Sequence, residues 1–137
     1  MPDARVEATV EVERWARTVS QGFFAATGFG EPELDVCRRL LRIENSTAWL
    51  AHVDGVPAAG AAMSTRDKLA LLFADSTIDK YRGAGLHLAL IRARLQHAAE
   101  QGCDLATAST APGSTSQHNY ERAGFRVAYT KLNMQRA

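Results

Sequence analysis

One stretch constrains this chain most, because an apolar run over Leu69–Ile78 leads through two glycines into a long helical pattern. The run predicts a central, largely buried strand. Tyr81–Gly85 interrupts it, and the helix that follows stops at Gln101 and Gly102. The chain must therefore build a strand, a tight turn and a helix as one unit. The helix has an apolar stripe of Leu88, Ile91, Leu95, Ala98 and Ala99, with Arg92, Arg94 and Gln96 expected mostly outside it.

The spacing of apolar residues predicts the elements on either side of this unit. Helices are expected over Glu11–Ala26, Glu33–Glu44 and Ser116–Ala123, and strands over Arg5–Val10, Ala48–Val53, Val56–Ser64 and Cys103–Ser109. Asp54 and Gly55 predict a two-residue hairpin turn. One closing strand, or two, is expected over Phe125–Met134. The pattern mixes helices with a sheet and has no internal repeat.

Length and charge limit the classes of function. The 137 residues fit one domain, 1–137, which can bury a core without staples. A net charge of +1 gives no overall field for nucleic acid or an anionic membrane, so any anion site must be local. The acidic amino terminus argues against a signal peptide, and no apolar run could span a bilayer. Cys37 and Cys103 are expected as reduced thiols of a cytoplasmic protein, with a disulfide as the alternative.

The turn Arg82–Gly85 has the features of an anion site. The first N–H groups of a helix lack partners within it, and the helix dipole places partial positive charge there. Glycines let a phosphate approach the backbone closely, and Arg82 adds a fixed positive charge. A plain strand-to-helix turn is the alternative interpretation. The turn lacks the Gly-Lys-Ser/Thr of a Walker loop and the third glycine of the dinucleotide fingerprint.

A second group of residues lies at Asn119–Phe125. A helix end at Gly124 and a core aromatic at Phe125 account for the last two positions structurally. Tyr120 lies on the short helix just before them, and a tyrosine hydroxyl can act as a general acid towards a leaving thiolate. A core tyrosine with a satisfied hydroxyl is the alternative.

Together, the turn Arg82–Gly85 before a long helix and the run Tyr120–Phe125 resemble the GNAT family of N-acetyltransferases. The likeness covers nearly the whole chain and is firmest from Ser46 onward. It implies an α/β (α+β) fold with a mixed, mostly antiparallel central sheet flanked by helices. It also implies an enzyme that passes an acetyl group from acetyl-CoA to an amine by direct attack, without a metal.

The resemblance implies roles for individual positions. The N–H groups of the loop Gly83–Leu88 would hold the CoA pyrophosphate. The strand end Asp75–Thr77 would splay from its neighbour beside the pantetheine arm, where a backbone N–H would polarise the acetyl carbonyl. Tyr120 would protonate the CoA thiolate. The expected catalytic residues are Tyr120 and Asp75, and the expected cofactor-binding residues are Ser76, Thr77, Arg82, Gly83, Ala84, Gly85, Leu86, His87, Leu88 and Asn119.

The chain departs from the family's pattern at three positions. His87 stands where the family usually has Gly or Ala, which implies weaker pyrophosphate binding unless the side chain points outward, as a surface helix residue would. Asp79 stands where Pro is frequent. The family's asparagine before the tyrosine falls at Gly113, and Asn119 is the candidate replacement.

The group that would take a proton from the amine is not marked by a motif. Asp75, Asp79, Glu44 and His52 are candidates, and a chain of waters is an alternative. Asp75 lies nearest the expected splay, where it would act as a base or hold a substrate cation. His97 and His118 are expected to be exposed helix residues.

The acceptor amine is not identified by the sequence, so small molecules and peptides stay open. We expect a cytoplasmic enzyme with no nucleic-acid or membrane partner, and the resemblance suggests a homodimer. Two alternatives stay open as well. The chain would be a GNAT-like acyl-CoA-binding or regulatory module without turnover, or the carboxyl-terminal part of a longer two-domain enzyme.

Overall fold

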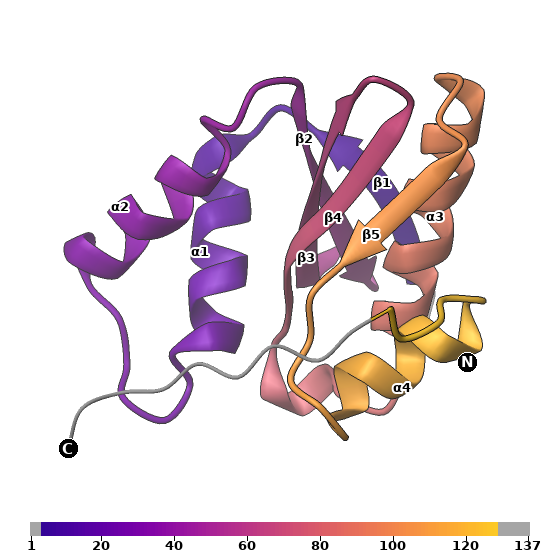
Figure 1. Cartoon of the computed structure of the whole chain (residues 1–137). Coiled ribbons are helices and arrows are strands. Elements are labelled where there is room, and N and C mark those ends of the chain that lie inside the picture. Colours follow the sequence, from indigo (N-terminus) through magenta and orange to yellow (C-terminus); the bar gives the residue numbers. More distant parts are fainter. Residues whose placement is uncertain (1–3, 129–137) are drawn as a thin grey trace, which may run out of the picture.

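The computed structural model describes residues 4–128, in which five strands form one sheet (Figure 1). The pairs β1–β2, β2–β3 and β3–β4 are antiparallel, and the pair β4–β5 is parallel. The strands, in sheet order, are β1 (Ala4–Thr9), β2 (Ser46–Val53), β3 (Val56–Arg66), β4 (Leu69–Thr77) and β5 (Leu105–Ala108). The helices are α1 (Val12–Phe23), α2 (Glu31–Leu40), α3 (Leu86–Glu100) and α4 (Thr115–Arg122), with a 3-10 turn η1 (Asp79–Tyr81).

Two short turns set the register of the antiparallel part. Asp54 and Gly55 join β2 to β3 with φ values of 50° and 81°, and Asp67 and Lys68 join β3 to β4 with 50° and 66°. Two successive positive φ values suit a tight hairpin turn, whose twist matches that of the strands. The Asp54–Gly55 turn predicted from the sequence is therefore confirmed, and the polar run Thr65–Lys68, which predicts a second turn, contains Asp67 and Lys68.

Helices cover both faces of the sheet (Figure 1). α1 packs closely on β3, where a Cβ on Gly60 would lie 2.8 Å from Val19 Cγ2. On the same face, Trp15 is fully buried, with Leu34 and Cys37 of α2 in its cluster. α3 buries Leu90 and Ile91 against the opposite face. The two layers leave the carboxyl ends of β4 and β5 between α1 and α4.

The predicted mixed, mostly antiparallel sheet flanked by helices is confirmed, and the element boundaries differ by a few residues. α2 begins early because Glu33 accepts a hydrogen bond from the Gly30 N–H at 2.9 Å. The prediction that Leu69–Ile78 is central and largely buried is wrong in part. β4 does lie between two strands, β3 and β5, but Leu69 and Leu71 keep 37% and 38% of their surface exposed. Residues 125–128 form no strand, and the rest of Phe125–Met134 lies outside the described residues.

Candidate active site

A β-bulge in β4 shapes the candidate site. Ala62 pairs with Phe73 and Gly60 pairs with Ser76, so two residues of β4, Ala74 and Asp75, lie opposite one residue of β3. Ala74 has a φ of 60°, a left-handed conformation that is unfavourable for alanine. The extra residue shifts the alternation of side chains along the strand. Asp75 therefore points towards α3 instead of α1.

Asp75 meets a buried arginine on α3. Arg94 Nη1 and Nη2 donate to the two carboxylate oxygens of Asp75 at 2.8 and 2.7 Å. Arg94 is fully buried, and 10% of the Asp75 side chain is exposed. Arg94 also donates to the carbonyls of Leu90 and Ala62, at 3.1 and 2.9 Å. The guanidinium is thus satisfied, and a buried ion pair with this bidentate geometry fixes Asp75 firmly.

Two further side chains bind the same carboxylate. His87 Nε2 lies 2.6 Å from Asp75 Oδ2, and the Tyr120 hydroxyl donates to that oxygen. A carboxylate only accepts, so Nε2 carries the hydrogen of this contact. The other ring nitrogen of His87, Nδ1, lies 3.0 Å from Asn119 Nδ2, which donates to it in this amide orientation. Asp75 thereby joins β4, α3 and α4 through one cluster of hydrogen bonds.

The cluster determines the charge of its members. Burial by itself raises the pKa of Asp75, but the His87 hydrogen bond, the Arg94 charge and the Tyr120 hydrogen bond together hold it below its ordinary value. Burial and the neighbouring Asp75 carboxylate raise the pKa of Tyr120 above that of a free tyrosine. Asp75 is therefore ionised and Tyr120 is a neutral phenol at neutral pH. A carboxylate that accepts four hydrogen bonds and has a lowered pKa is a poor general base.

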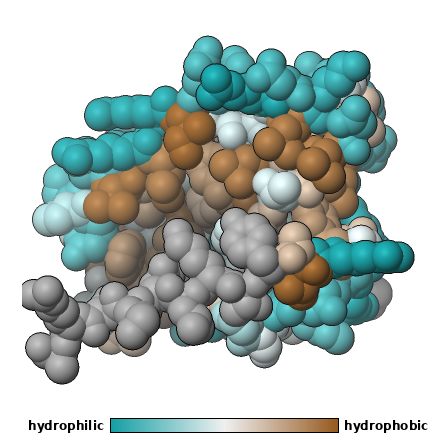
Figure 2. Space-filling view, in the orientation of Figure 1, coloured by the Kyte–Doolittle hydropathy of each residue, from teal (hydrophilic) through white to brown (hydrophobic). Residues whose placement is uncertain are grey.

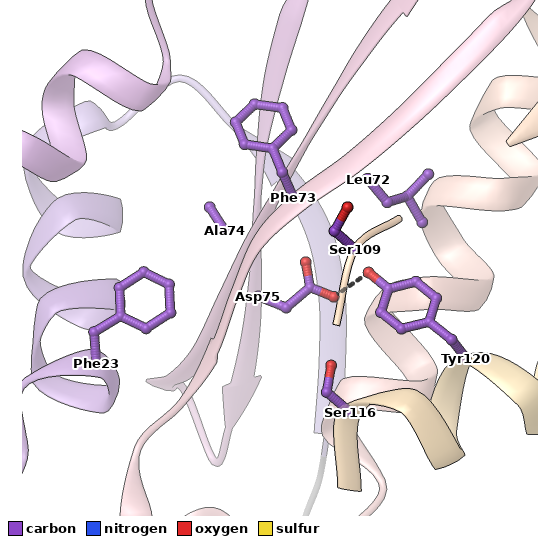
Figure 3. Close-up of a pocket in the computed structure, with 8 residues that line it drawn as sticks. All are labelled: Phe23, Leu72, Phe73, Ala74, Asp75, Ser109, Ser116 and Tyr120. Atoms are coloured by element: carbon purple, nitrogen blue, oxygen red, sulfur yellow. Dashed lines mark hydrogen bonds between the residues drawn. The ribbon is translucent and has the colours of Figure 1, made fainter. Parts of the chain in front are cut away.

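A pocket opens where β4 and β5 part. Their pairing ends at Leu72 and Ala108, so β4 beyond Leu72 has no strand beside it on that edge within the described residues. The cavity has a volume of about 220 Å³. Phe23 of α1 stands on one side and Tyr120 of α4 on the other, with Asp75 between them (Figure 3). The other lining residues are Leu72, Phe73, Ala74, Ser109 and Ser116.

The amino terminus of α3 presents an open backbone. Gly83 and Gly85 both have a φ of 80°, and nothing lies within 4 Å of a Cβ built on either. The first helical hydrogen bond runs from the Ala89 N–H to the Gly85 carbonyl at 3.1 Å. The N–H groups of residues 86–88 therefore have no partner within the helix. Arg82 stands beside them with 60% of its side chain exposed, in an ion pair of 3.1 Å with Asp79. This terminus is suited to a phosphate.

His87 connects this terminus to the pocket. Its backbone belongs to the first turn of α3, while its side chain contacts Asp75 and Asn119 and stacks edge-on against Tyr120, with ring centroids 5.4 Å apart. Only 15% of the side chain is exposed. The prediction that His87 is a surface helix residue is therefore wrong.

The other predicted site residues are divided between the two regions. Asp75 and Tyr120 meet in the pocket wall, and Arg82–Leu88 form the open turn and the first turn of α3. Ser76 faces away from both, because its hydroxyl donates to the Val19 carbonyl of α1 at 2.8 Å. The Thr77 carbonyl accepts from Arg82 Nε at 3.3 Å. Glu44 and His52, suggested as bases, do not line the pocket.

Arg94 belongs to the site, although no motif in the sequence indicates it. It was expected outside the apolar stripe of α3, but it is fully buried. Its spacing carried the signal, since it lies three residues after Ile91 and four before Ala98, on the same helical face. His118 is exposed as predicted, whereas His97 packs edge-on against Trp49 at a centroid distance of 5.4 Å.

Among the helices of residues 4–128, none has both the length and the apolar character to cross a membrane. The same part of the chain has no group of three or more His, Cys, Asp or Glu side chains arranged to hold a metal ion.

Solved structures share this fold at low sequence identity. A putative acetyl transferase from Pyrococcus furiosus has a TM-score of 0.78 at 14% identity, over 97% of this chain and 99% of that one. Aminoglycoside N-acetyltransferase AAC(6')-Iy, solved with the bisubstrate analogue CoA-S-monomethyl-acetylneamine, has a TM-score of 0.74 at 18% identity, over 98% of this chain and 99% of that one. Glucosamine-6-phosphate N-acetyltransferase from Arabidopsis thaliana has a TM-score of 0.73 at 13% identity, over 97% of this chain and 98% of that one.

The family follows from the sequence itself. No curated protein sequence matches this chain significantly. The model of the acetyltransferase (GNAT) family, however, matches residues 10–125, which include the bulged strand, the open helix terminus and Tyr120. The chain belongs to the GNAT family of acetyltransferases.

Proposed function

We propose that this protein is an N-acetyltransferase that passes the acetyl group of acetyl-CoA directly to an amine. One observation carries the proposal: the open amino terminus of α3 and the pocket at the β4–β5 splay are connected by a single residue, His87. An anion site beside a pocket suits a substrate that has a pyrophosphate at one end and a thioester at the other. Structures of similar fold include acetyltransferases for aminoglycosides and glucosamine-6-phosphate.

The proposed binding mode assigns the acyl donor to two regions. The free N–H groups of Leu86, His87 and Leu88 bind the pyrophosphate, and Arg82 adds charge at the surface. The pantetheine arm enters between β4 and β5 beyond Leu72, where the edge of β4 has no strand partner among the described residues. An N–H on this edge then polarises the acetyl carbonyl. Gly83 and Gly85 keep the approach to the backbone open.

The proposed reaction is a direct displacement. The neutral amine nitrogen attacks the thioester carbon, a C–N bond forms, the C–S bond breaks, and the nitrogen releases its extra proton to water. The departing sulfur takes up a proton from water. Tyr120 stands in the pocket wall as a phenol, and it stabilises the sulfur by donating a hydrogen bond once its O–H turns from Asp75. Its raised pKa makes complete proton transfer costly. Asp75 acts as a positioning residue, because its oxygens already accept four hydrogen bonds.

A matched pair of variants tests the anion site. Gly83 has nothing within 4 Å of a Cβ, and Asp and Asn both tolerate a positive φ. Gly83→Asp and Gly83→Asn differ by one charge at nearly the same shape. We expect calorimetry to show acetyl-CoA bound about tenfold more weakly by the Asp variant than by the Asn variant, from repulsion of the pyrophosphate. Equal affinities for the two variants would refute the anion site.

A second assay separates the enzyme from an acyl-CoA-binding or regulatory module. Free thiol release from acetyl-CoA, measured with a panel of amines, is expected only for an enzyme. A dimer, a cytoplasmic location and the assignment of residues 1–137 to one domain stay predictions, which light scattering, cell fractionation and limited proteolysis would test.

A further inference from the structure

The pocket has two dissimilar sides, and this asymmetry bears on the unknown acceptor. Tyr120 and Ser116 come from α4 (Figure 3), and the Tyr120 ring packs edge-on against His87 of the first turn of α3. The opposite side consists of Phe23 of α1 and Phe73 and Ala74 of β4. If the acyl donor enters from the α3 side, as the proposed function requires, the acceptor is left with the aromatic side.

This side of the pocket is apolar and accessible. Phe23 keeps 45% of its surface exposed, although it is a large hydrophobic residue at the end of α1. On the face shown in Figure 2, hydrophobic side chains gather across the middle of the molecule between hydrophilic margins. An exposed aromatic ring that lines a pocket gains from covering by an apolar ligand group.

The pocket has no free carboxylate to attract a cation. Asp75 is the only acidic residue among the eight that line it, and Arg94 compensates its charge in a bidentate pair. Residues 129–137 contain no Asp or Glu either, so Asp3 is the only carboxylate side chain outside the described residues. An alkylammonium ion entering the pocket would lose water without finding an opposite charge.

An amine that enters without its proton avoids this cost. Model α-amino groups have a pKa of about 7.7–8.0, and a lysine-type amine has about 10.4. At pH 7.5 about one molecule in three of the first is neutral, against about one in 800 of the second. This difference of roughly 250-fold favours the weaker base, although the greater nucleophilicity of the stronger base offsets part of it.

We propose that the acceptor is a small, weakly basic primary amine with an apolar substituent, typified by the α-amine of an apolar amino-acid amide. The amine enters as the free base, and its substituent packs against Phe23 and Phe73. Polycationic amines, such as the aminoglycosides of structurally similar enzymes, are poor acceptors on this proposal. The inference rests on the proposed function.

Matched acceptors test the role of basicity. Phenylalanine amide and 2-phenylethylamine carry the same ring on the same chain, and the carboxamide of the first lowers the pKa of its amine. We expect kcat/KM for thiol release at pH 7.5 to be more than tenfold higher with phenylalanine amide, and the ratio to shrink towards pH 9.5. Glycinamide, which lacks the apolar group, is expected to be more than tenfold poorer than phenylalanine amide.

A pair of variants tests the aromatic side. Phe23→Ala should raise KM for phenylalanine amide at least fivefold and leave that for glycinamide within twofold. Phe29→Ala is the control, because Phe29 is also a partly exposed phenylalanine but does not line the pocket. Faster turnover of spermidine or kanamycin than of phenylalanine amide would overturn the inference and leave the proposed function standing. Acetyl-CoA binding without thiol release to any of these amines would overturn the inference, and absence of binding would overturn both.

Discussion

Replacement of Arg94 by methionine should be among the most damaging single changes in this fold. The side chain is fully buried and donates to Asp75 at 2.7 and 2.8 Å. Without the guanidinium, the ionised Asp75 carboxylate keeps only His87 and Tyr120 as donors. The Ala62 carbonyl also loses the hydrogen bond that Arg94 donates to it. Breaking a buried pair in this way costs about 3–5 kcal/mol. Arg92→Met is the control, since Arg92 is exposed on the same helix and should change stability by no more than about 0.5 kcal/mol.

A double variant tests whether the unpaired charge of Asp75 causes the loss of stability in Arg94→Met. Asp75→Asn on top of Arg94→Met removes the unpaired charge and keeps an acceptor for the remaining donors. We expect the double variant to regain about 2 kcal/mol of the loss, measured by urea unfolding followed through tryptophan fluorescence. A cost below about 1 kcal/mol for Arg94→Met, or a further loss of stability when Asp75→Asn is added, would show that an unpaired buried charge is not the cause.

The same pair predicts the acid limb of stability. Because the pKa of Asp75 is lower in the folded chain, its contribution is fully present above the unfolded value of about 3.9 and is lost as pH falls through the folded pKa. Wild type should therefore lose stability more steeply below about pH 4 than Asp75→Asn, which has no such group to protonate. Equal slopes for the two proteins in urea titrations between pH 4 and pH 2 would contradict the lowered pKa.

Three further predictions concern neighbouring contacts. Tyr120 should stay un-ionised above pH 10 while the chain is folded, so Tyr120→Phe should leave the alkaline absorbance rise near 295 nm unchanged up to unfolding; a smaller rise would refute the raised pKa. Gly22→Ala should cost about 1–3 kcal/mol in urea unfolding, because its Cβ would lie 2.9 Å from the Thr77 carbonyl oxygen; a neutral result would mean that α1 shifts freely on β4. Trp15→Phe should cost about 1–3 kcal/mol in the same assay, since Trp15 Nε1 donates to the Ala61 carbonyl at 2.9 Å, and unchanged stability would show that this carbonyl finds another donor.

The sequence predicts much of the fold because most of its signals are local. The turn at Asp54–Gly55 and the turn before α3 can both be predicted, because a few residues with a known backbone preference determine each of them. The bulge at Ala74 has no such signature, because alanine has no preference for a positive φ. Without the bulge, alternation along β4 would point Asp75 at α1, and the carboxylate cluster could not be foreseen.

Helical spacing could have revealed more of the site than it did. His87 and Arg94 lie four residues before and three residues after Ile91, and so they share the buried face of α3. Charged and polar residue types suggested exposure, and this general preference outweighed the spacing. A charged side chain is buried when it has a partner of opposite charge, and the partner of Arg94 comes from a strand that is distant in the sequence.

The Asp75–Arg94 pair is hard to explain by stability alone. Well-packed apolar residues can replace a buried ion pair at little or no cost, and the αL conformation of Ala74 that presents Asp75 adds about 1–2 kcal/mol of strain. What apolar residues cannot do is direct the Tyr120 hydroxyl and the His87 ring at fixed points of the pocket wall. The double variant Asp75→Leu, Arg94→Met should therefore fold with stability within about 2 kcal/mol of wild type and bind acetyl-CoA, yet lose most of its thiol release with an accepted amine. If turnover survives in that variant, the pair serves packing, and the assignment of Asp75 as a positioning residue is wrong.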